Sequence, residues 1–457
     1  MTDLLTIILA AGQGTRMKSN LIKVLHQLNG QPMIQHIVDQ VKGLSSKVIV
    51  VVGYQAEKVR ASLSDQQLVF VEQKEQLGTG HAVMQAQEYI KKHSGPVLIL
   101  CGDTPLLTAE SLKVLVDTKK RQEAAATILT AYFDNPAGYG KIIRNQAEQV
   151  IGIVEEKDAS PAEQQIKEIN SGVYCIDSLT LNQALEQLGN SNAQGEYYLT
   201  DAISYLNERR QKIIPVVIND GEEIIGVNDR INLARAEKVL RERINNDHMR
   251  NGVTIIDPAT TYIDSRVEIG FDTVIYPFTT IEGDTKIGQG NKIGSYCRIK
   301  DAIIGNNVEI IDHCILLNCS LADQTMIGPF AYIRPGTTVA QGAKVGDFVE
   351  LKKAFIGCNS KVPHLSYVGD AVIGEGTNIG AGTIFANYDG KVKHNTIVGS
   401  SVFIGSNSTL VAPVKIADGG KTGAGAVVTK DVPQGETVVG VPARVIKEKK
   451  EGGSKDH

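Results

Sequence analysis

The sequence has no excess of basic residues: 47 lysines and arginines stand against 51 aspartates and glutamates, giving a formal net charge of −4. A broad nucleic-acid surface needs a basic excess to neutralise phosphates, so this balance argues against nucleic acid as a partner. Small phosphorylated ligands remain compatible with it, because they need only local cations.

Long apolar runs and paired cysteines are also missing. No stretch approaches the roughly 20 apolar residues that span a bilayer, so membrane insertion is not expected. The apolar start carries Asp3 and runs into a glycine turn, which predicts a buried first strand rather than a signal peptide. The six cysteines form no Cys-x-x-Cys pair. We therefore expect reduced thiols in a cytoplasmic protein, in preference to zinc ligands or disulfides.

The 457 residues are too many for one ordinary core and change in pattern near the middle. Residues 1–228 alternate strand-like runs with helical stretches, which predicts an α/β domain with a mostly parallel sheet. The expected strands include Leu5–Ala10, Lys47–Val52, Val97–Leu100 and Thr127–Ala131, and the expected helices include Met33–Leu44 and Ala109–Arg121.

After about residue 262, aliphatic residues recur at intervals of six: Ile263, Ile269, Ile275, Ile281, Ile287, Ile293 and Ile299. The pattern slips and resumes up to Ile416. This period fits neither a helix nor a simple alternating strand, and it is typical of a parallel β-helix in which three hexads form one coil. Breaks near residues 318–326 and 385–396 predict insertions, the second a projecting loop.

We expect a linker helix over residues 229–252, because its apolar residues fall on one face and Asn251-Gly252 supplies a stop. The β-helix is then expected over residues 253–446, followed by a charged, glycine-rich tail over 447–457 that is predicted to be disordered.

Two features of the N-terminal half point to phosphate chemistry. Gly12 and Gly14 follow the first strand directly and allow a tight turn whose N–H groups can face phosphate oxygens, without the spacing of a dinucleotide-binding loop. Arg16 and Lys23 add cations where charge builds during phosphoryl transfer. Asp103 follows the run Val97–Leu100 and can hold Mg²⁺, cap the helix that begins at Ala109, or form a turn.

The motifs taken together resemble a known family. They are Leu9-Ala-Ala-Gly-x-Gly-Thr-Arg-Met, Glu75-Gln-Leu-Gly-Thr-Gly-His-Ala, Gly102-Asp103, Gly138-Tyr-Gly, Glu168-Ile-Asn-Ser-Gly and Asn192-Ala-Gln-Gly-Glu-Tyr-Tyr. With the hexapeptide half, they resemble the bacterial bifunctional N-acetylglucosamine-1-phosphate uridyltransferase/glucosamine-1-phosphate N-acetyltransferase family. The resemblance covers residues 3 to about 445 and implies a left-handed β-helix.

The resemblance implies two reactions that make UDP-N-acetylglucosamine for peptidoglycan and the cell wall. Acetyl-CoA acetylates glucosamine-1-phosphate, and N-acetylglucosamine-1-phosphate then attacks the α-phosphate of UTP and releases pyrophosphate. It assigns catalytic roles in uridyl transfer to Arg16 and Lys23. It places the other residues at the nucleotide (Leu9, Ala10, Ala11, Gly12, Gly14), at uracil (Gln73, Gly78, Thr79), at the sugar (Gly140, Glu155, Asn170) and at Mg²⁺ (Asp103, Asn228).

In the second half, His364 stands among polar residues on an otherwise aliphatic scaffold. An isolated histidine is commonly structural, whereas the resemblance implies a general base for the glucosamine amine, a role that suits an imidazole near neutral pH. It further implies a phosphate clamp (Arg334, Lys352), sugar contacts (Tyr367, Asn378, Lys393) and acetyl-CoA contacts (Ala381, Asn387, Tyr388, Ser406, Ala424).

Four departures from the family pattern stand out. Ile22 replaces a proline, which predicts a looser loop around Lys23 and weaker uridyl transfer. Pro363 precedes His364, and Lys421-Thr422 occupies a repeat position where an aliphatic residue is expected. Gly440 lies where some members carry an arginine for acetyl-CoA; Lys421 either replaces that cation or is a solvated turn residue.

Two other interpretations are open from the sequence. The chain is either bifunctional or a single-activity sugar-phosphate nucleotidyltransferase with a regulatory or structural β-helix; the motifs His364-Leu-Ser-Tyr and Asn387-Tyr-Asp-Gly favour the former. A purely structural β-helix protein explains neither the glycine loop nor Gly102-Asp103. The resemblance also implies a cytoplasmic homotrimer with acetyl-transfer sites between β-helices.

Overall fold

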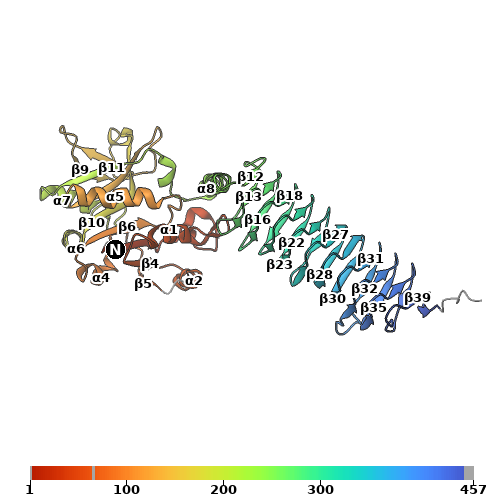
Figure 1. The fold of residues 1–457 in the computed structure, drawn as a ribbon. Helices are drawn as coiled ribbons and strands as arrows, with labels where there is room; N and C mark the ends of the chain where they lie inside the picture. The colour runs from red at the N-terminus through yellow and green to blue at the C-terminus, as the bar shows by residue number, and fades with distance from the viewer. Residues whose placement is uncertain (1–2, 64–66, 447–457) are drawn as a thin grey trace, which may run out of the picture. The chain divides into compact units, whose positions relative to one another are not determined.

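The computed structural model describes residues 3–63 and 67–446, and the tail predicted over 447–457 lies outside them. It divides into two compact units, Met1–Leu240 and Arg241–His457 (Figure 1). No helix of the described residues has the length and apolar character needed to cross a bilayer.

Unit 1 is built on a nine-stranded mixed sheet with strand order β11-β7-β10-β6-β1-β4-β5, to which β8 and β9 are attached; β10 is antiparallel to β6, β7 and β8. The strands are β1 Leu5–Ala10, β4 Lys47–Val52, β5 Leu68–Glu72, β6 Pro96–Cys101, β7 Ala126–Tyr132, β8 Lys141–Arg144, β9 Val150–Val154, β10 Glu168–Asp177 and β11 Ile213–Val217. A small hairpin pairs β2 Gln27–Leu28 with β3 Gln31–Pro32. The central strand β1 pairs in parallel with β4 and β6, so the loops after these strands meet at one edge of the sheet.

Helices cover the sheet of unit 1. They are α1 Met33–Lys42, α2 Ala56–Ser62, α3 Thr79–Met84, α4 Gln87–Lys91, α5 Ala109–Arg121, α6 Ser178–Leu185 and α7 Asp201–Glu208, with short 3₁₀ turns η1 Thr15–Met17, η2 Lys23–Leu25, η3 Glu163–Gln165 and η4 Gly221–Ile224. The apolar runs predicted as strands lie inside the sheet and not at its edges. Helices cover both faces there, so most of the side chains of these strands are buried, which explains their nearly continuous apolar sequence. Where the sequence predicted a helix over 229–252, the structure contains α8, Arg230–Arg250.

Unit 2 is a parallel β-helix whose short strands stack coil upon coil along three sides (Figure 1). The first side holds β12 Thr254–Ile255, β15 Val274–Ile275, β18 Lys292–Ile293, β21 Glu309–Ile310, β24 Met326–Ile327, β27 Lys344–Asp347, β29 Lys361–His364, β31 Asn378–Ile379, β34 Phe403–Ile404, β37 Lys421–Thr422 and β39 Thr437–Val439, closed by the antiparallel β40 Arg444–Val445. The second holds β13 Tyr262–Ile263, β16 Thr280–Glu282, β19 Arg298–Lys300, β22 Ile315–Leu317, β25 Tyr332–Ile333, β28 Glu350–Ile356, β30 Tyr367–Ile373, β32 Ile384–Ala386, β35 Thr409–Val411 and β38 Val427–Val428.

The third side holds β14 Glu268–Ile269, β17 Lys286–Ile287, β20 Ile303–Ile304, β23 Cys319–Leu321 and β26 Thr337–Val339, then the second parts of β28 and β30, and finally β33 Thr396–Val398 and β36 Val414–Ile416. The hexad residues line the interior of the coils. Ile263 pairs with Ile281 and Ile281 with Ile299, 18 residues apart, and all three side chains are buried. The predicted fold class, an α/β nucleotidyltransferase-like domain followed by a hexapeptide β-helix, is confirmed.

One of the two predicted insertions is wrong. Near 318–326, Asn318 alone joins β22 to β23, at a φ of 43°, and Leu316 and Leu321 both point into the core. The phase changes because this coil is one residue shorter than three hexads: Ile304 pairs with Leu321, 17 residues on. The break at 385–396 is a true insertion, since Val372 pairs with Ile397, 25 residues on.

Candidate active sites

The first candidate site lies at the ends of β1 and β6 in unit 1. Gly14 has a φ of 69°, and a Cβ added to it would come within 2.5 Å of the Cβ of Lys23. Glycine is therefore required where the loop after β1 crosses Lys23. Ile22 has a φ of −56°, close to the value that proline would impose, is fully buried, and donates its N–H to Gln55 Oε1 at 3.3 Å.

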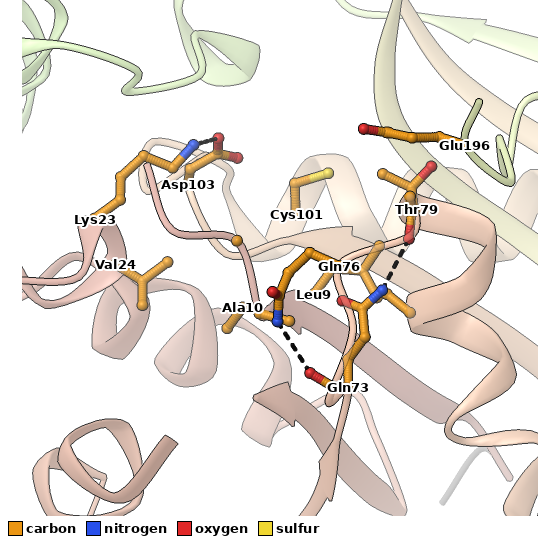
Figure 2. Close-up of a pocket in the computed structure, with 14 residues that line it drawn as sticks. Leu9, Ala10, Lys23, Val24, Gln73, Gln76, Thr79, Cys101, Asp103 and Glu196 are labelled. Atoms are coloured by element: carbon orange, nitrogen blue, oxygen red, sulfur yellow. Dashed lines mark hydrogen bonds and ion pairs between the residues drawn. The ribbon is translucent and has the colours of Figure 1, made fainter. Parts of the chain in front are cut away.

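A cavity of about 290 Å³ opens beside this loop (Figure 2). It is lined by Leu9, Ala10, Ala11, Gly12, Lys23, Val24, Gln73, Gln76, Gly78, Thr79, Ala82, Cys101, Asp103 and Glu196. Lys23 and Asp103 meet at one end in Figure 2, and Gln73 and Thr79 lie at the other with Cys101 between. One elongated ligand can therefore contact both ends.

The charged end joins segments that are far apart in the chain. Lys23 Nζ donates to Asp103 Oδ2 and, at 3.1 Å, to Asn228 Oδ1. Arg16 donates to the same Asn228 oxygen at 2.9 Å. The Val227 N–H donates to the Asp103 carbonyl at 2.8 Å, which ties the loop after β6 to the loop before α8. Asp103 is not a helix cap, because Thr108 caps α5 by accepting from the Ser111 N–H.

Glutamine amides shape the other end of the cavity. Gln73 Nε2 donates to the Gly78 carbonyl at 3.1 Å, and Gln76 Nε2 donates to the Gln73 carbonyl at 3.1 Å. Gly78 has a φ of 107°, and a Cβ there would lie 2.6 Å from the Tyr197 carbonyl oxygen. Thr79 Oγ1 accepts from the Leu199 N–H at 3.1 Å. This end therefore offers polar groups of fixed orientation against an apolar wall.

Gly140, Glu155 and Asn170 do not line that cavity but lie together. The Asn170 N–H donates to the Gly140 carbonyl at 2.8 Å, and a Cβ on Gly140 would lie 3.5 Å from Glu155 Oε2. Burial raises the pKa of Glu155, which accepts a hydrogen bond from Thr200 Oγ1. Burial also raises the pKa of Cys101 to about 12, with smaller contributions from Asp103 and Glu155. Cys101 thus lies between these residues and the charged end of the cavity.

The second candidate site follows one corner of the β-helix in unit 2. His364 ends β29, and the register of β27 with β29 sets it directly beside Asp347. His364 Nδ1 and Asp347 Oδ1 are 2.5 Å apart, and this hydrogen bond lowers the pKa of Asp347. A carboxylate only accepts, so the hydrogen lies on Nδ1 and leaves Nε2 with its lone pair. The side chain of His364 is 56% exposed.

Cations gather on the neighbouring side of the β-helix. Arg334 donates to Glu350 Oε1 at 2.7 Å, and Lys352 Nζ lies 3.8 Å from Asp370 Oδ2. Lys352 lowers the pKa of Lys393, because the two ammonium groups lie together. Asn387 Nδ2 donates to Asp370 Oδ2 at 2.5 Å and lies 3.5 Å from the Tyr367 hydroxyl. Two adjacent lysines favour an anionic ligand between them.

A column of small residues continues the corner beyond His364. Ala381 is one coil further on, since the Gly382 N–H donates to the His364 carbonyl at 3.4 Å. Ser406 and Ala424 follow in turn: the Asn407 N–H donates to the Ala381 carbonyl and the Gly425 N–H to the Ser406 carbonyl, at 2.7 and 2.8 Å.

Asn387 and Tyr388 begin the inserted loop, and Tyr388 is 59% exposed. Asn378 lies on β31, paired with Lys361 rather than with the cation cluster.

Comparisons with known proteins cover both units. Residues 6–165 match the MobA-like NTP transferase domain, and residues 266–301 match the bacterial transferase hexapeptide, six repeats. The chain is 51% identical over 443 residues to "Bifunctional protein GlmU" of Geobacillus sp. (strain WCH70), covering 97% of this chain and 96% of the relative. It is 50% identical over 429 residues to the protein of the same name from Syntrophomonas wolfei subsp. wolfei, covering 93% and 95%. The chain belongs to the GlmU family.

A third GlmU relative, from Heliobacterium modesticaldum, is 49% identical over 443 residues and covers 97% of this chain. Because such relatives align over both units, the family extends through the β-helix and does not end with the nucleotidyltransferase domain. The family resemblance predicted from the motifs is therefore confirmed.

The sequence did not single out several residues of the two sites. In unit 1 these are Gln76, Cys101 and Glu196, although all three lie in or beside motifs that carry the GlmU resemblance. In unit 2 they are the carboxylates Asp347, Glu350 and Asp370, each bonded to a predicted site residue. Their signal in the sequence is only their spacing of about one coil from those partners.

Two of the remaining departures from the GlmU pattern have local explanations. Lys421 is exposed on β37, whereas Thr422 is buried and its Oγ1 accepts from the Gly405 N–H at 2.9 Å. Gly440 has a φ of 94°, which disfavours any larger side chain. All six cysteines are free in this structure. Among the described residues, no group of three or more His, Cys, Asp or Glu side chains could hold a metal ion.

Proposed function

We propose that the unit 1 cavity is the site of uridyl transfer and that the His364 corner of unit 2 is the site of acetyl transfer. As a member of the GlmU family, the chain is a bifunctional enzyme of UDP-N-acetylglucosamine synthesis. It transfers acetyl from acetyl-CoA to glucosamine-1-phosphate, then uridylyl from UTP to N-acetylglucosamine-1-phosphate with release of pyrophosphate. The uridyltransferase domain comprises residues 1–228 and the acetyltransferase domain residues 253–446. The helical segment 229–252 links them, and the tail follows the second domain.

In unit 1, the base binds at the Gln73 end of the cavity and the triphosphate at the Lys23 end. The loop from Ala10 to Gly14 follows the phosphates with its backbone N–H groups, and Arg16 and Lys23 neutralise charge on the α-phosphate and the departing pyrophosphate. Gly140, Glu155 and Asn170 hold the sugar so that its phosphate oxygen attacks in line. Such a transfer depends on positioning and charge neutralisation rather than on a strong base.

Mg²⁺ is part of this proposal, and the donor set of unit 1 suits it. Magnesium is commonly held by one or two protein oxygens together with substrate phosphates and water. Asp103 and Asn228 supply one carboxylate and one amide oxygen, both bonded to the Lys23 ammonium. The bound ion would neutralise charge on the triphosphate.

In unit 2, His364 is the general base. Its Nε2 accepts a proton from the glucosamine amine as the nitrogen attacks the acetyl carbonyl carbon. The C–S bond of acetyl-CoA then breaks, the departing sulfur takes the proton from His364 Nε2 and leaves as the thiol of coenzyme A, and an N-acetyl bond remains. Asp347 keeps the imidazole in the required tautomer.

Substrate binding in unit 2 is divided between three groups of residues. Arg334 and Lys352 bind the sugar phosphate, and Tyr367, Asn378 and Lys393 bind the sugar. The column Ala381, Ser406 and Ala424 leaves room for acetyl-CoA, which Asn387 and Tyr388 contact from the loop.

A homotrimer is part of the proposal, and a column of aromatic rings supports it. Phe278, Tyr296, His313, Phe330 and Phe348 stack one coil apart at the same corner, with centroids 4.7 to 5.2 Å apart. We call these five residues the aromatic column. Four of them are 47–57% exposed, and so long an exposed apolar ridge is typical of an interface.

The aromatic column leads to the proposed acetyl-transfer site. Its corner continues with Leu365, which is 60% exposed, and then with Gly382, Asn407 and Gly425. In a second copy of the chain that lies parallel to the first, the coils have the same spacing. That copy can therefore pack along the aromatic column. At Gly382 and Gly425 the corner carries no side chain, so such packing leaves a slot beside His364 for acetyl-CoA. The enzyme acts in the cytoplasm, a compartment that keeps thiols reduced, and supplies UDP-N-acetylglucosamine for peptidoglycan and the cell wall.

The His364–Asp347 pair beside a lysine cluster is the observation that carries the second activity. A coupled assay with glucosamine-1-phosphate, acetyl-CoA, UTP and Mg²⁺, each omitted in turn, tests the whole proposal. We expect free thiol without UTP, and pyrophosphate only when acetyl-CoA or N-acetylglucosamine-1-phosphate is supplied. Uridyl transfer with no thiol release would instead support a single-activity enzyme with a structural β-helix.

A further inference from the structure

The position of the Lys23 ammonium group has a consequence for metal binding in unit 1. Lys23 Nζ donates to Asp103 Oδ2 and to Asn228 Oδ1, the two oxygens assigned above to Mg²⁺. The side chains of Lys23 and Asp103 are only 15% and 21% exposed, so water competes little for this contact. A divalent ion that binds both oxygens must therefore displace the ammonium group.

The backbone of Asp103 and the amide of Asn228 have contacts that do not involve Lys23. The Val227 N–H holds the Asp103 carbonyl at 2.8 Å, and Arg16 holds Asn228 Oδ1 at 2.9 Å. Asn228 Nδ2 also donates to the Gly226 carbonyl at 3.4 Å. Removing the ammonium group thus frees Asp103 Oδ2 of its cation, while Asn228 Oδ1 keeps its hydrogen bond from Arg16.

The displaced ammonium group has an alternative partner on the same side of the cavity. Lys23 lines the cavity beside Ala11 and Gly12, where the phosphates are placed. An ammonium group is a flexible point charge that can move from a carboxylate to a phosphate on its four-carbon stem. A triphosphate therefore draws Lys23 away from Asp103 and opens the metal site at the same time.

We propose that Lys23 is a placeholder cation that blocks the two metal ligands until a nucleoside triphosphate takes it over, so that metal and triphosphate bind cooperatively. This inference rests on the proposed metal site. Coupling of this kind is reciprocal: whatever factor the triphosphate adds to metal affinity, the metal adds to triphosphate affinity. Free Mg²⁺ then binds weakly on its own, and the complete site assembles only around the nucleotide.

The test is a calorimetric titration of the full-length protein with Mg²⁺, with and without a UTP analogue whose α,β-bridging oxygen is replaced by an imido group. Lys23→Met keeps the length of the side chain without its charge, and Lys23→Arg is the matched control that keeps the charge. Without nucleotide, we expect Lys23→Met to bind Mg²⁺ about tenfold more tightly than wild type, as expected for the loss of one partly buried competing charge. Lys23→Arg should bind Mg²⁺ like wild type.

The analogue should tighten Mg²⁺ binding more in wild type than in Lys23→Met, because only wild type has an ammonium group to release. Equal or weaker Mg²⁺ binding by Lys23→Met, with an unchanged circular dichroism spectrum and melting temperature, would overturn the placeholder role. Asp103→Ala separates the two ideas. If Asp103→Ala bound Mg²⁺ as wild type does, the metal assignment itself would fail, whereas failure of Lys23→Met alone leaves that assignment standing.

Discussion

The two units assemble their sites over very different distances along the chain. In unit 1, Arg16 and Lys23 reach Asn228 across 212 and 205 residues, so the charged end of the cavity exists only when the whole domain is folded. In unit 2, the contacts of His364 with Asp347, Arg334 with Glu350 and Asn387 with Asp370 span 17, 16 and 17 residues, about one coil. A repeating scaffold thus builds a site from neighbouring coils, which makes its coil length critical.

The two units should also differ in their need for a second copy of the chain. Because the exposed aromatic column lies on unit 2, we expect the activity of unit 2, and not that of unit 1, to depend on contacts between copies. Phe330→Asp with Phe348→Asp places charges in the aromatic column, where packing of a second copy would leave them buried and unpaired. We expect loss of the trimer in sedimentation and a fall in acetyl transfer of at least about 100-fold, with uridyl transfer unchanged. Phe403→Asp, at an equally exposed phenylalanine on β34, is the matched control. A trimer that survives the double substitution would place the interface elsewhere.

The lysine cluster of unit 2 offers a smaller and more local test. Lys352→Ala removes a cation that lies with Lys393, and charged hydrogen bonds of this kind contribute about 1.5–3 kcal/mol. We expect kcat/KM for glucosamine-1-phosphate to fall about 10- to 100-fold in a thiol-release assay. Lys353→Ala, one residue on but exposed, should leave it unchanged. Equal losses in both variants would show that the fall in kcat/KM comes from the lower positive charge of the surface rather than from a lost contact with the phosphate.

Asp347→Asn tests the orientation of the base. Asparagine fills the same space without the charge that fixes the Nδ1 hydrogen, so acetyl transfer should fall about tenfold. The loss should be modest because the His364 side chain is half exposed, so water can accept the Nδ1 hydrogen in place of the Asp347 carboxylate. The pH–rate profile separates orientation from structure: it should change shape in Asp347→Asn, whereas damage to the coil would lower the rate equally at every pH.

Glu155 gives the smallest predicted effect, on the stability of unit 1. Its folded-state pKa is raised by burial, so between the unfolded and folded pKa values the folded state binds more protons and stability falls as pH rises. Glu155→Gln removes this cost at neutral pH, and we expect a melting temperature about 2–4 °C higher at pH 7.5. The gain should shrink as pH falls through the folded pKa. A gain that is independent of pH would contradict burial as its cause.

The sequence predicted the strands and most of the scaffold because their signals are periodic. Alternating apolar runs place β1, β4, β6 and β7, and the helix expected over Ala109–Arg121 is α5 with those bounds. The hexads likewise identify the β-helix core. A strict period of three hexads would pair His364 with Gly346, however, and only the 17-residue coil brings Asp347 to it.

What the sequence could not predict depends on contacts that leave no periodic trace. Ile22 breaks the family pattern, yet its buried side chain and its bond to Gln55 restore the proline-like φ. Glu196 reaches the cavity from a loop that shows no chemical signal apart from the family motif. The resemblance supplied the site residues of both units, and their roles stay predictions.

The separation of the two chemistries is tested most directly by paired substitutions assayed for both activities. Asp103→Ala should lower pyrophosphate release from UTP and N-acetylglucosamine-1-phosphate by at least about 100-fold, since it removes the proposed metal ligand. His364→Ala should lower thiol release from acetyl-CoA and glucosamine-1-phosphate by about 10²–10⁴-fold, the usual contribution of a general base. Each variant should keep the other activity near wild type. If either substitution lowered both rates equally in an intact oligomer, the two-site account would be contradicted.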